Sequence, residues 1–180
     1  MVQSTLSPPL TLDQFLTTPD IETSPAWELL DSCAHQKPVP TLFHSRIQRN
    51  LVNYINSNCD RYEAIQELRC LVPPNSPVPD ISVIAVERLS EDDGPFNGAP
   101  DWLIEVRSPD QSTLKLQSKI LHCLDSGTQL AWLIDCDRDR IWVWETDGLP
   151  MVYGGDDILP DLKLGLGLTV NAVAAMARQR

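Results

Sequence analysis

Two apolar segments, each beside an acidic residue, constrain this chain most. They are Ile81–Val86 and Asp101–Arg107, and a polar loop joins them. The loop is centred so that Asp80 and Glu105 lie almost equally far from its middle. If the two segments pair as an antiparallel hairpin, the two carboxylates lie close to opposite each other.

Two carboxylates held that close repel, and one stays protonated unless a cation lies between them. Mg²⁺ or Mn²⁺ is such a cation, since one or two carboxylates bind it while it keeps several waters. The ion lowers the pKa of a bound water or contacts a phosphate oxygen. The spacing equally allows Asp80 and Glu105 to be solvated residues at strand ends, so both interpretations stay open.

A helix expected over residues 112–125 places a lysine near the two acids. Lys119 lies at the border of its apolar stripe, because three residues of helix rotate by roughly 300°. A lysine there can extend along apolar surface and bring its ammonium back over the sheet. Lys115 and His122 point further outward and are expected to be solvated.

The remaining pattern predicts an α/β fold of the α+β type, with a central mixed sheet flanked by helices. Strand, helix and strand in succession predict a right-handed crossover between parallel strands at 101–107 and 129–135. Residues 61–72 are expected to form one strand. An edge carboxylate is the favoured interpretation of Glu67, and the alternative is that it joins the acidic pair if its strand lies beside that of Asp80. The other expected helices are 11–16, 42–56 and 170–177, and the other expected strands are 27–30, 34–39, 140–145, 151–153 and 162–168.

Basic residues cluster at the start of the predicted helix 42–56, where the helix dipole favours anions. The cluster consists of His44, Arg46 and Arg49, with Gln48 beside them. A solvated polar face is the favoured explanation, and a negatively charged partner is the alternative.

Composition bounds the function. The chain has 180 residues and a formal net charge of -11, so its overall field does not attract nucleic acid, and any such binding needs a local basic patch. Five cysteines without a CxxC pair indicate neither a disulfide framework nor a zinc site.

Residues 1–10 are expected to be a flexible tail without signal-peptide character, and residues 11–180 a single domain. No apolar stretch approaches membrane-spanning length, so a reduced, cytoplasmic protein is expected.

Several segments together resemble a known family. They are Thr11–Leu16, Trp27–Asp31, His44–Gln48, Pro79–Val83, Pro100–Val106 with Ser108–Pro109, Lys119 with Gly127, and Trp132–Asp135. In this order and spacing the chain, over residues 11–170, resembles the Uma family of restriction-endonuclease-like proteins, within the PD-(D/E)xK nuclease superfamily.

The resemblance implies a restriction-endonuclease-like core and a Mg²⁺- or Mn²⁺-dependent site. Asp80, Glu105 and the backbone carbonyl of Val106 would bind the metal, and Lys119 would be the catalytic lysine on the helix. Glu28, His44 and Gln48 occupy family-typical positions near the site, and His44 and Gln48 are candidate substrate-binding residues. DNA is the implied substrate and a homodimer the implied assembly.

The sequence departs from the family pattern at two places. Arg107 stands where an apolar residue is expected, and two positions after the acid, where a PD-(D/E)xK nuclease has lysine. Arginine stays charged and is a poor activator of water, but it can stabilise phosphate charge and is a candidate substrate-binding residue. Ser32 replaces a glycine, which affects only a turn.

Two functions therefore remain. The first is a metal-dependent endonuclease that hydrolyses phosphodiester bonds in DNA, with Asp80, Glu105 and Lys119 as catalytic residues. The alternative is a catalytically inactive nuclease-fold module that binds protein or nucleic acid as a homodimer. Trp142 and Trp144 share one strand face and are expected either to be buried or to form a dimer surface.

Overall fold

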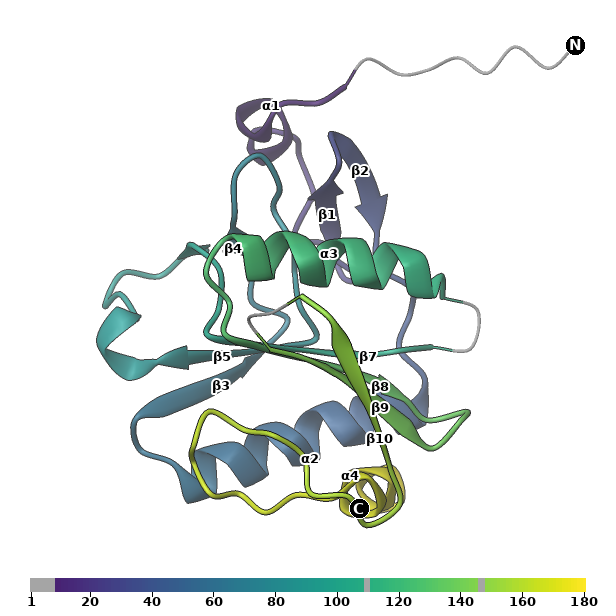
Figure 1. Ribbon diagram of the computed structural model, residues 1–180. Coiled ribbons are helices and arrows are strands. Elements are labelled where there is room, and N and C mark those ends of the chain that lie inside the picture. The colour runs from purple at the N-terminus through teal and green to yellow at the C-terminus, as the bar shows by residue number, and fades with distance from the viewer. Residues whose placement is uncertain (1–8, 109–110, 146–147) are drawn as a thin grey trace, which may run out of the picture.

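The computed structural model describes residues 9–108, 111–145 and 148–180, and centres on a mixed sheet of six strands (Figure 1). The strand order is β10-β9-β8-β7-β5-β3, with β7 and β8 parallel and the other neighbours antiparallel. The strands are β3 (Tyr62–Gln66), β5 (Ile81–Ala85), β7 (Trp102–Val106), β8 (Leu130–Asp135), β9 (Arg140–Trp144) and β10 (Pro150–Gly154). The predicted fold class is confirmed, as is the parallel crossover.

The central hairpin has the predicted register. Ile81 on β5 pairs with Ile104 on β7, so the next step along both strands brings Asp80 opposite Glu105. β5 and β7 are both fully buried apart from Ala85, because the sheet is covered on both faces. A carboxylate at this end of the strands is therefore enclosed by protein rather than solvated.

Helices cover the two faces of the sheet. α2 (Leu42–Asn58) and α4 (Val170–Met176) lie on one face, and α3 (Thr113–Asp125) lies on the other (Figure 1). The apolar stripe of α2, formed by Ile47, Leu51 and Ile55, packs into the larger core cluster, whereas Leu116 and Ile120 of α3 pack into the second one. All three helices had been predicted, with ends differing by one or two residues.

A smaller unit extends from the side of the sheet that α3 covers (Figure 1). It contains α1 (Leu12–Leu16) and the hairpin of β1 (Trp27–Leu30) and β2 (Cys33–Gln36). Thr11 is the N-cap of α1 and forms a capping box with Gln14. Leu29 joins the hairpin to the rest of the chain through two backbone hydrogen bonds with Ser76. This attachment brings Glu28 of β1 over the end of the central sheet.

The prediction of one strand over residues 61–72 was wrong. β3 ends at Gln66, Glu67 adopts a left-handed conformation (φ 51°), and the chain resumes only as β4 (Cys70–Leu71), which pairs with β6 (Phe96–Asn97). A residue with positive φ breaks the alternation of a strand. The break turns the Glu67 side chain toward the site described below.

The predicted strand over residues 162–168 is also absent. Lys163, Gly165 and Gly167 all have positive φ, which a continuous strand does not allow. The carboxylate of Asp161 accepts hydrogen bonds from the backbone N–H groups of Leu164 and Leu166, at 2.7 and 2.8 Å. One side chain thus takes the place of a neighbouring strand as the hydrogen-bond acceptor.

Trp144 is buried and Trp142 is partly buried, both in the core cluster beneath α3. Of the two outcomes expected for this pair, burial is therefore the one observed.

The 3-10 helix η1 (Val86–Arg88) follows β5. The predicted tail over residues 1–10 lies outside the described residues up to residue 8.

Candidate active site

Asp80 lies directly before β5 and is buried, with both carboxylate oxygens engaged. Oδ2 accepts a hydrogen bond from the backbone N–H of Val106 at 2.7 Å, which ties the acid to the end of β7. Oδ1 lies 2.8 Å from the ammonium of Lys37. The end of one strand and a cation from elsewhere in the chain thus fix the orientation of this carboxylate.

Lys37 follows β2, and nothing in the sequence pattern singled it out. Its Nζ donates to Asp80 Oδ1, to Glu67 Oε2 at 2.7 Å and to the carbonyl of Val78 at 2.8 Å. The sequence interval to Asp80 exceeds forty residues, so no local periodicity could have indicated the contact. Glu67 had been predicted as an edge carboxylate outside the acidic pair; the structure instead connects it to Asp80 through Lys37, although its side chain is still 42% exposed.

Glu105, Lys119 and Glu28 form a second, more deeply buried group. The Lys119 ammonium lies 2.7 Å from Glu28 Oε1 and 2.8 Å from Glu105 Oε1, and all three side chains are less than 10% exposed. Glu28 Oε1 also accepts the backbone N–H of Val78 at 2.7 Å. Lys119 therefore reaches from α3 back over the sheet, as its border position predicted.

His44 and Gln48 come from the first turns of α2 and face the same cluster. Gln48 Nε2 donates to the carbonyl of Asp80 at 2.6 Å and to Glu67 Oε1 at 2.9 Å. His44 Nε2 lies 3.5 Å from Asp80 Oδ1, which is long for a hydrogen bond. Among the described residues, His44, Glu67 and Asp80 form one group whose potential metal-ligand atoms all lie within 4.8 Å of one another.

Other predicted cations have contacts away from this cluster. Arg107 contacts Asp135 at 3.1 Å and Asp137 at 3.4 Å, at the end of β8 and the turn after it. Arg46 and Arg49 donate to the carbonyls of Ala177 and Gln179 beyond α4. His122 was expected to be solvated, but a ring nitrogen lies 2.8 Å from the carbonyl of Val72, so that expectation was wrong.

Burial and neighbouring charges shift the pKa values of the two central acids in opposite directions. Burial raises the pKa of Glu105 to about 8, and the charge of Asp80 adds to this effect while Lys119 opposes it. Burial would also raise the pKa of Asp80, but Lys37 and His44 outweigh it and hold the pKa well below its ordinary value. The pair therefore behaves as two close carboxylates of which one tends to keep a proton.

Nearby carboxylates favour the protonated forms of Lys37, Lys119 and His44. Burial lowers the pKa values of Lys37 and Lys119, but nearby carboxylates outweigh burial and raise both above the ordinary value. For Lys37 the main partner is Asp80, and for Lys119 it is Glu105 followed by Glu28. The pKa of His44 is also raised, since contact with Asp80 exceeds the effect of burial.

The donor set fits a hard divalent cation. Four carboxylates, those of Glu28, Glu67, Asp80 and Glu105, share only two ammonium groups. The carboxylates therefore outnumber the ammonium groups that contact them, and the charge of Asp80 adds to the rise that burial causes in the pKa of Glu105. Oxygen ligands of this kind bind Mg²⁺ and Mn²⁺ in proteins.

Comparisons with known proteins agree with this architecture. Residues 12–172 match the protein family Uma2, described as "Putative restriction endonuclease". A crystal structure of "a putative nuclease belonging to DUF820" from Anabaena variabilis ATCC 29413 is similar, with 38% sequence identity and a TM-score of 0.87. The similarity covers 94% of this chain and 99% of that chain. No curated protein matches. Because the family match spans nearly the whole chain, this protein belongs to the Uma2 family.

Proposed function

We propose that the protein is a metal-dependent endonuclease that hydrolyses phosphodiester bonds in DNA. The observation that carries the proposal is the convergence of Asp80, Glu105 and Lys119 at one end of β5 and β7, with excess negative charge. Membership of Uma2 and the similarity to a nuclease structure add support.

In this proposal Asp80 and Glu105 bind Mg²⁺ or Mn²⁺, and the backbone carbonyl of Val106 is a third ligand. A bound divalent ion supplies Lewis acidity and lowers the pKa of a coordinated water. The Val106 N–H holds Asp80 in orientation by its 2.7 Å hydrogen bond, and Lys37 balances its charge.

Lys119 acts as a cation in this proposal. An ammonium that contacts two buried carboxylates at 2.7 and 2.8 Å carries its proton, so it stabilises negative charge that develops on the phosphate instead of taking a proton from water. His44, Gln48 and Arg107 remain the candidate substrate-binding residues. Of these, Gln48 contacts the backbone of Asp80, which makes it a positioning residue as well.

Metal removal tests the proposal directly. We expect the protein to nick or linearise supercoiled plasmid DNA in Mg²⁺ or Mn²⁺, to lose this activity in EDTA, and to regain it when excess metal is restored. Agarose gels read the outcome. Cleavage that persists in EDTA would exclude the metal-dependent mechanism.

A second prediction concerns Gln48. In Gln48→Leu both hydrogen bonds to the Asp80 carbonyl and to Glu67 are lost, so we expect Mn²⁺ affinity to fall by about 10- to 100-fold, as outer-shell losses typically produce. Isothermal titration calorimetry measures the Mn²⁺ affinity. Asn53→Leu, on the exposed side of the same helix, is the control and should leave the affinity unchanged. Equal affinities in the two variants would contradict the positioning role.

The alternative function, an inactive nuclease-fold module that binds as a homodimer, draws on the net charge of -11 and on an exposed sheet edge. Met151 and Val152 of the edge strand β10 are 65% and 48% exposed, which suits pairing with a second copy. Light scattering measures the assembly state. A dimer that binds no metal and cleaves no DNA would favour the module.

In the described part of the chain, no helix has the length and apolar character needed to cross a bilayer.

A further inference from the structure

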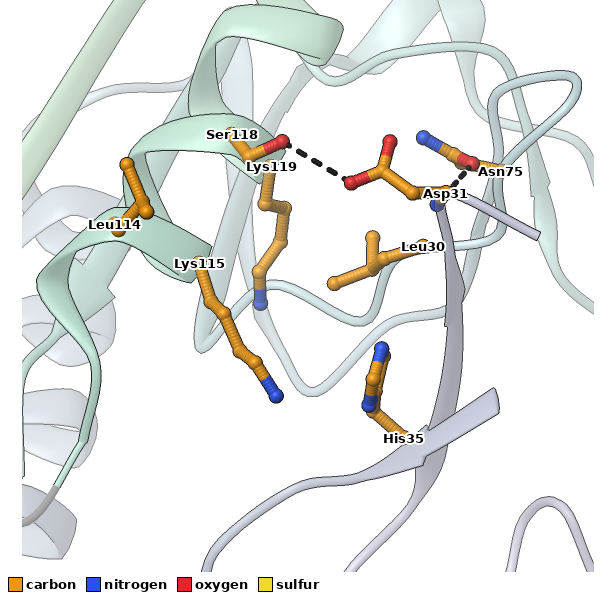
Figure 2. Close-up of a pocket in the computed structure, with 8 residues that line it drawn as sticks. All are labelled: Leu30, Asp31, His35, Asn75, Leu114, Lys115, Ser118 and Lys119. Carbon is orange, nitrogen blue, oxygen red and sulfur yellow. Dashed lines mark hydrogen bonds between the residues drawn. The ribbon is translucent and has the colours of Figure 1, made fainter. Parts of the chain in front are cut away.

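A cavity of about 380 Å³ lies between α3 and the β1–β2 hairpin (Figure 2). Lys115 and Lys119 of α3 line one side, and His35 of β2 lines the other. Leu30 and Leu114 add apolar wall, and Leu114 is 75% exposed. The cavity therefore shares Lys119 with the candidate active site and opens beside it.

The positions of these donors follow from helix and strand periodicity. Lys115 precedes Lys119 by four residues, so both lie on one face of α3. His35 is the register partner of Glu28, whose carboxylate contacts Lys119, so both side chains leave the hairpin on the same face. Figure 2 shows the Lys115 ammonium pointing toward the His35 ring.

Lys115 differs from the other two lysines near the site. Lys37 and Lys119 each contact two carboxylates, whereas no ion pair or hydrogen bond involves the Lys115 side chain within residues 9–108, 111–145 and 148–180. One acid lines the same cavity, Asp31, and Ser118 Oγ lies 3.4 Å from its carboxylate. An amine that faces a cavity and has no acceptor among the described residues is available to bind an anion.

The net charge of the protein makes this cation significant. A chain with a formal charge of -11 needs a local basic patch to bind nucleic acid. Arg46 and Arg49, the arginines near the start of α2, donate to backbone carbonyls near the C-terminus. Lys115, together with the imidazole of His35, supplies donors of the kind that bind phosphate, beside the ammonium that faces the proposed cleavage site.

We propose that this cavity binds a phosphate of the DNA strand next to the phosphate that is cleaved, through the Lys115 ammonium and the His35 ring. The inference rests on the proposed nuclease function. Leu30 and Leu114 then contact the apolar face of the neighbouring sugar or base.

Fluorescence anisotropy with a labelled DNA oligonucleotide in EDTA tests the proposal without cleavage. We expect Lys115→Gln to weaken binding about tenfold, as the loss of a charged hydrogen bond does, and to reduce the salt dependence by about one phosphate contact. Lys115→Arg should retain most of the affinity. Lys163→Gln is the matched control, because it removes the same charge from an exposed lysine in the loop before α4.

A second measurement locates the anion. The chain has three histidines, so imidazole NMR signals can be assigned individually. Titration with inorganic phosphate should shift the His35 signals and leave those of His122 unchanged, and Lys115→Gln should abolish the shift. Absent or unchanged shifts at His35 would overturn the proposal.

The two proposals fail in different ways. If wild type cleaves DNA in Mg²⁺ but Lys115→Gln binds oligonucleotide as Lys163→Gln does, the phosphate subsite is wrong and the nuclease stands. If DNA binding depends on Lys115 but no cleavage occurs in Mg²⁺ or Mn²⁺, the subsite stands and the catalytic proposal is wrong. A wild-type protein that binds no oligonucleotide overturns the subsite.

Discussion

Asp80→Asn is expected to reduce Mg²⁺-dependent plasmid cleavage by at least about a hundredfold, since a metal ligand contributes several kcal/mol to stabilising the transition state. The amide keeps the size of the side chain but removes the charge that Lys37 and the proposed ion share. The variant should also lose Mn²⁺ binding in calorimetry. The cleavage assay and the titration are independent readouts of the same residue.

Asp101→Asn is the matched control for this variant. Asp101 is also buried, and it also accepts one backbone N–H, that of Ala85 at 2.8 Å, and contacts one cation, Arg88 at 2.7 Å. Asp101 directly precedes β7, beside the end of β5 that is opposite to Asp80. The Asp101→Asn variant therefore removes a comparable acid far from the site. We expect cleavage and Mn²⁺ binding to persist in Asp101→Asn. Equal loss in both variants would mean that stability, and not metal binding, explains the effect.

Lys119→Met is expected to lower the free energy of unfolding by about 3–5 kcal/mol, the usual cost of removing one partner from a buried ion pair. Methionine is similar in length, but it leaves the carboxylates of Glu28 and Glu105 buried without their ammonium. The effect applies at neutral pH: the contacts raise the pKa of Lys119 above its ordinary value despite burial, so this stabilisation is present below that ordinary value and is lost as the pH rises through the raised one. Urea unfolding followed by circular dichroism measures the change.

Two further variants support this measurement. Lys115→Met, one turn earlier on the same helix and exposed, should change stability by no more than about 0.5 kcal/mol. Adding Glu28→Gln to Lys119→Met should restore part of the loss, because one buried charge is removed. A loss below about 1 kcal/mol for Lys119→Met alone would contradict the buried contacts of its ammonium.

Local sequence pattern was sufficient to predict the elements that carry the two acids and the candidate catalytic lysine. Alternation and symmetric spacing about a loop indicated that Asp80 and Glu105 lie opposite each other, and the register of β5 and β7 has this geometry. Helical rotation placed Lys119 at the border of an apolar stripe, and its ammonium does extend over the sheet. These features depend on the periodicity of neighbouring residues, which the sequence displays directly.

Local pattern failed where backbone conformation or long-range charge decided the outcome. The strand predicted over residues 61–72 breaks at Glu67, whose positive φ no periodicity indicates. The break directs the Glu67 carboxylate to Lys37. Arg107 lies on the predicted strand, but its contacts are with Asp135 and Asp137 at the end of the neighbouring strand.

The sequence by itself determined the sheet, its covering helices and the positions of Asp80, Glu105 and Lys119 along them, because hydrophobic periods of two and 3.6 residues specify which side chains share a face. Only the tertiary structure decided which charges meet. Lys37 reaches Asp80, and Glu28 reaches Lys119, from a hairpin far away along the chain. The physical reason is that ion pairs in a buried cluster depend on distance in space and on burial, and neither quantity is encoded by spacing along the chain.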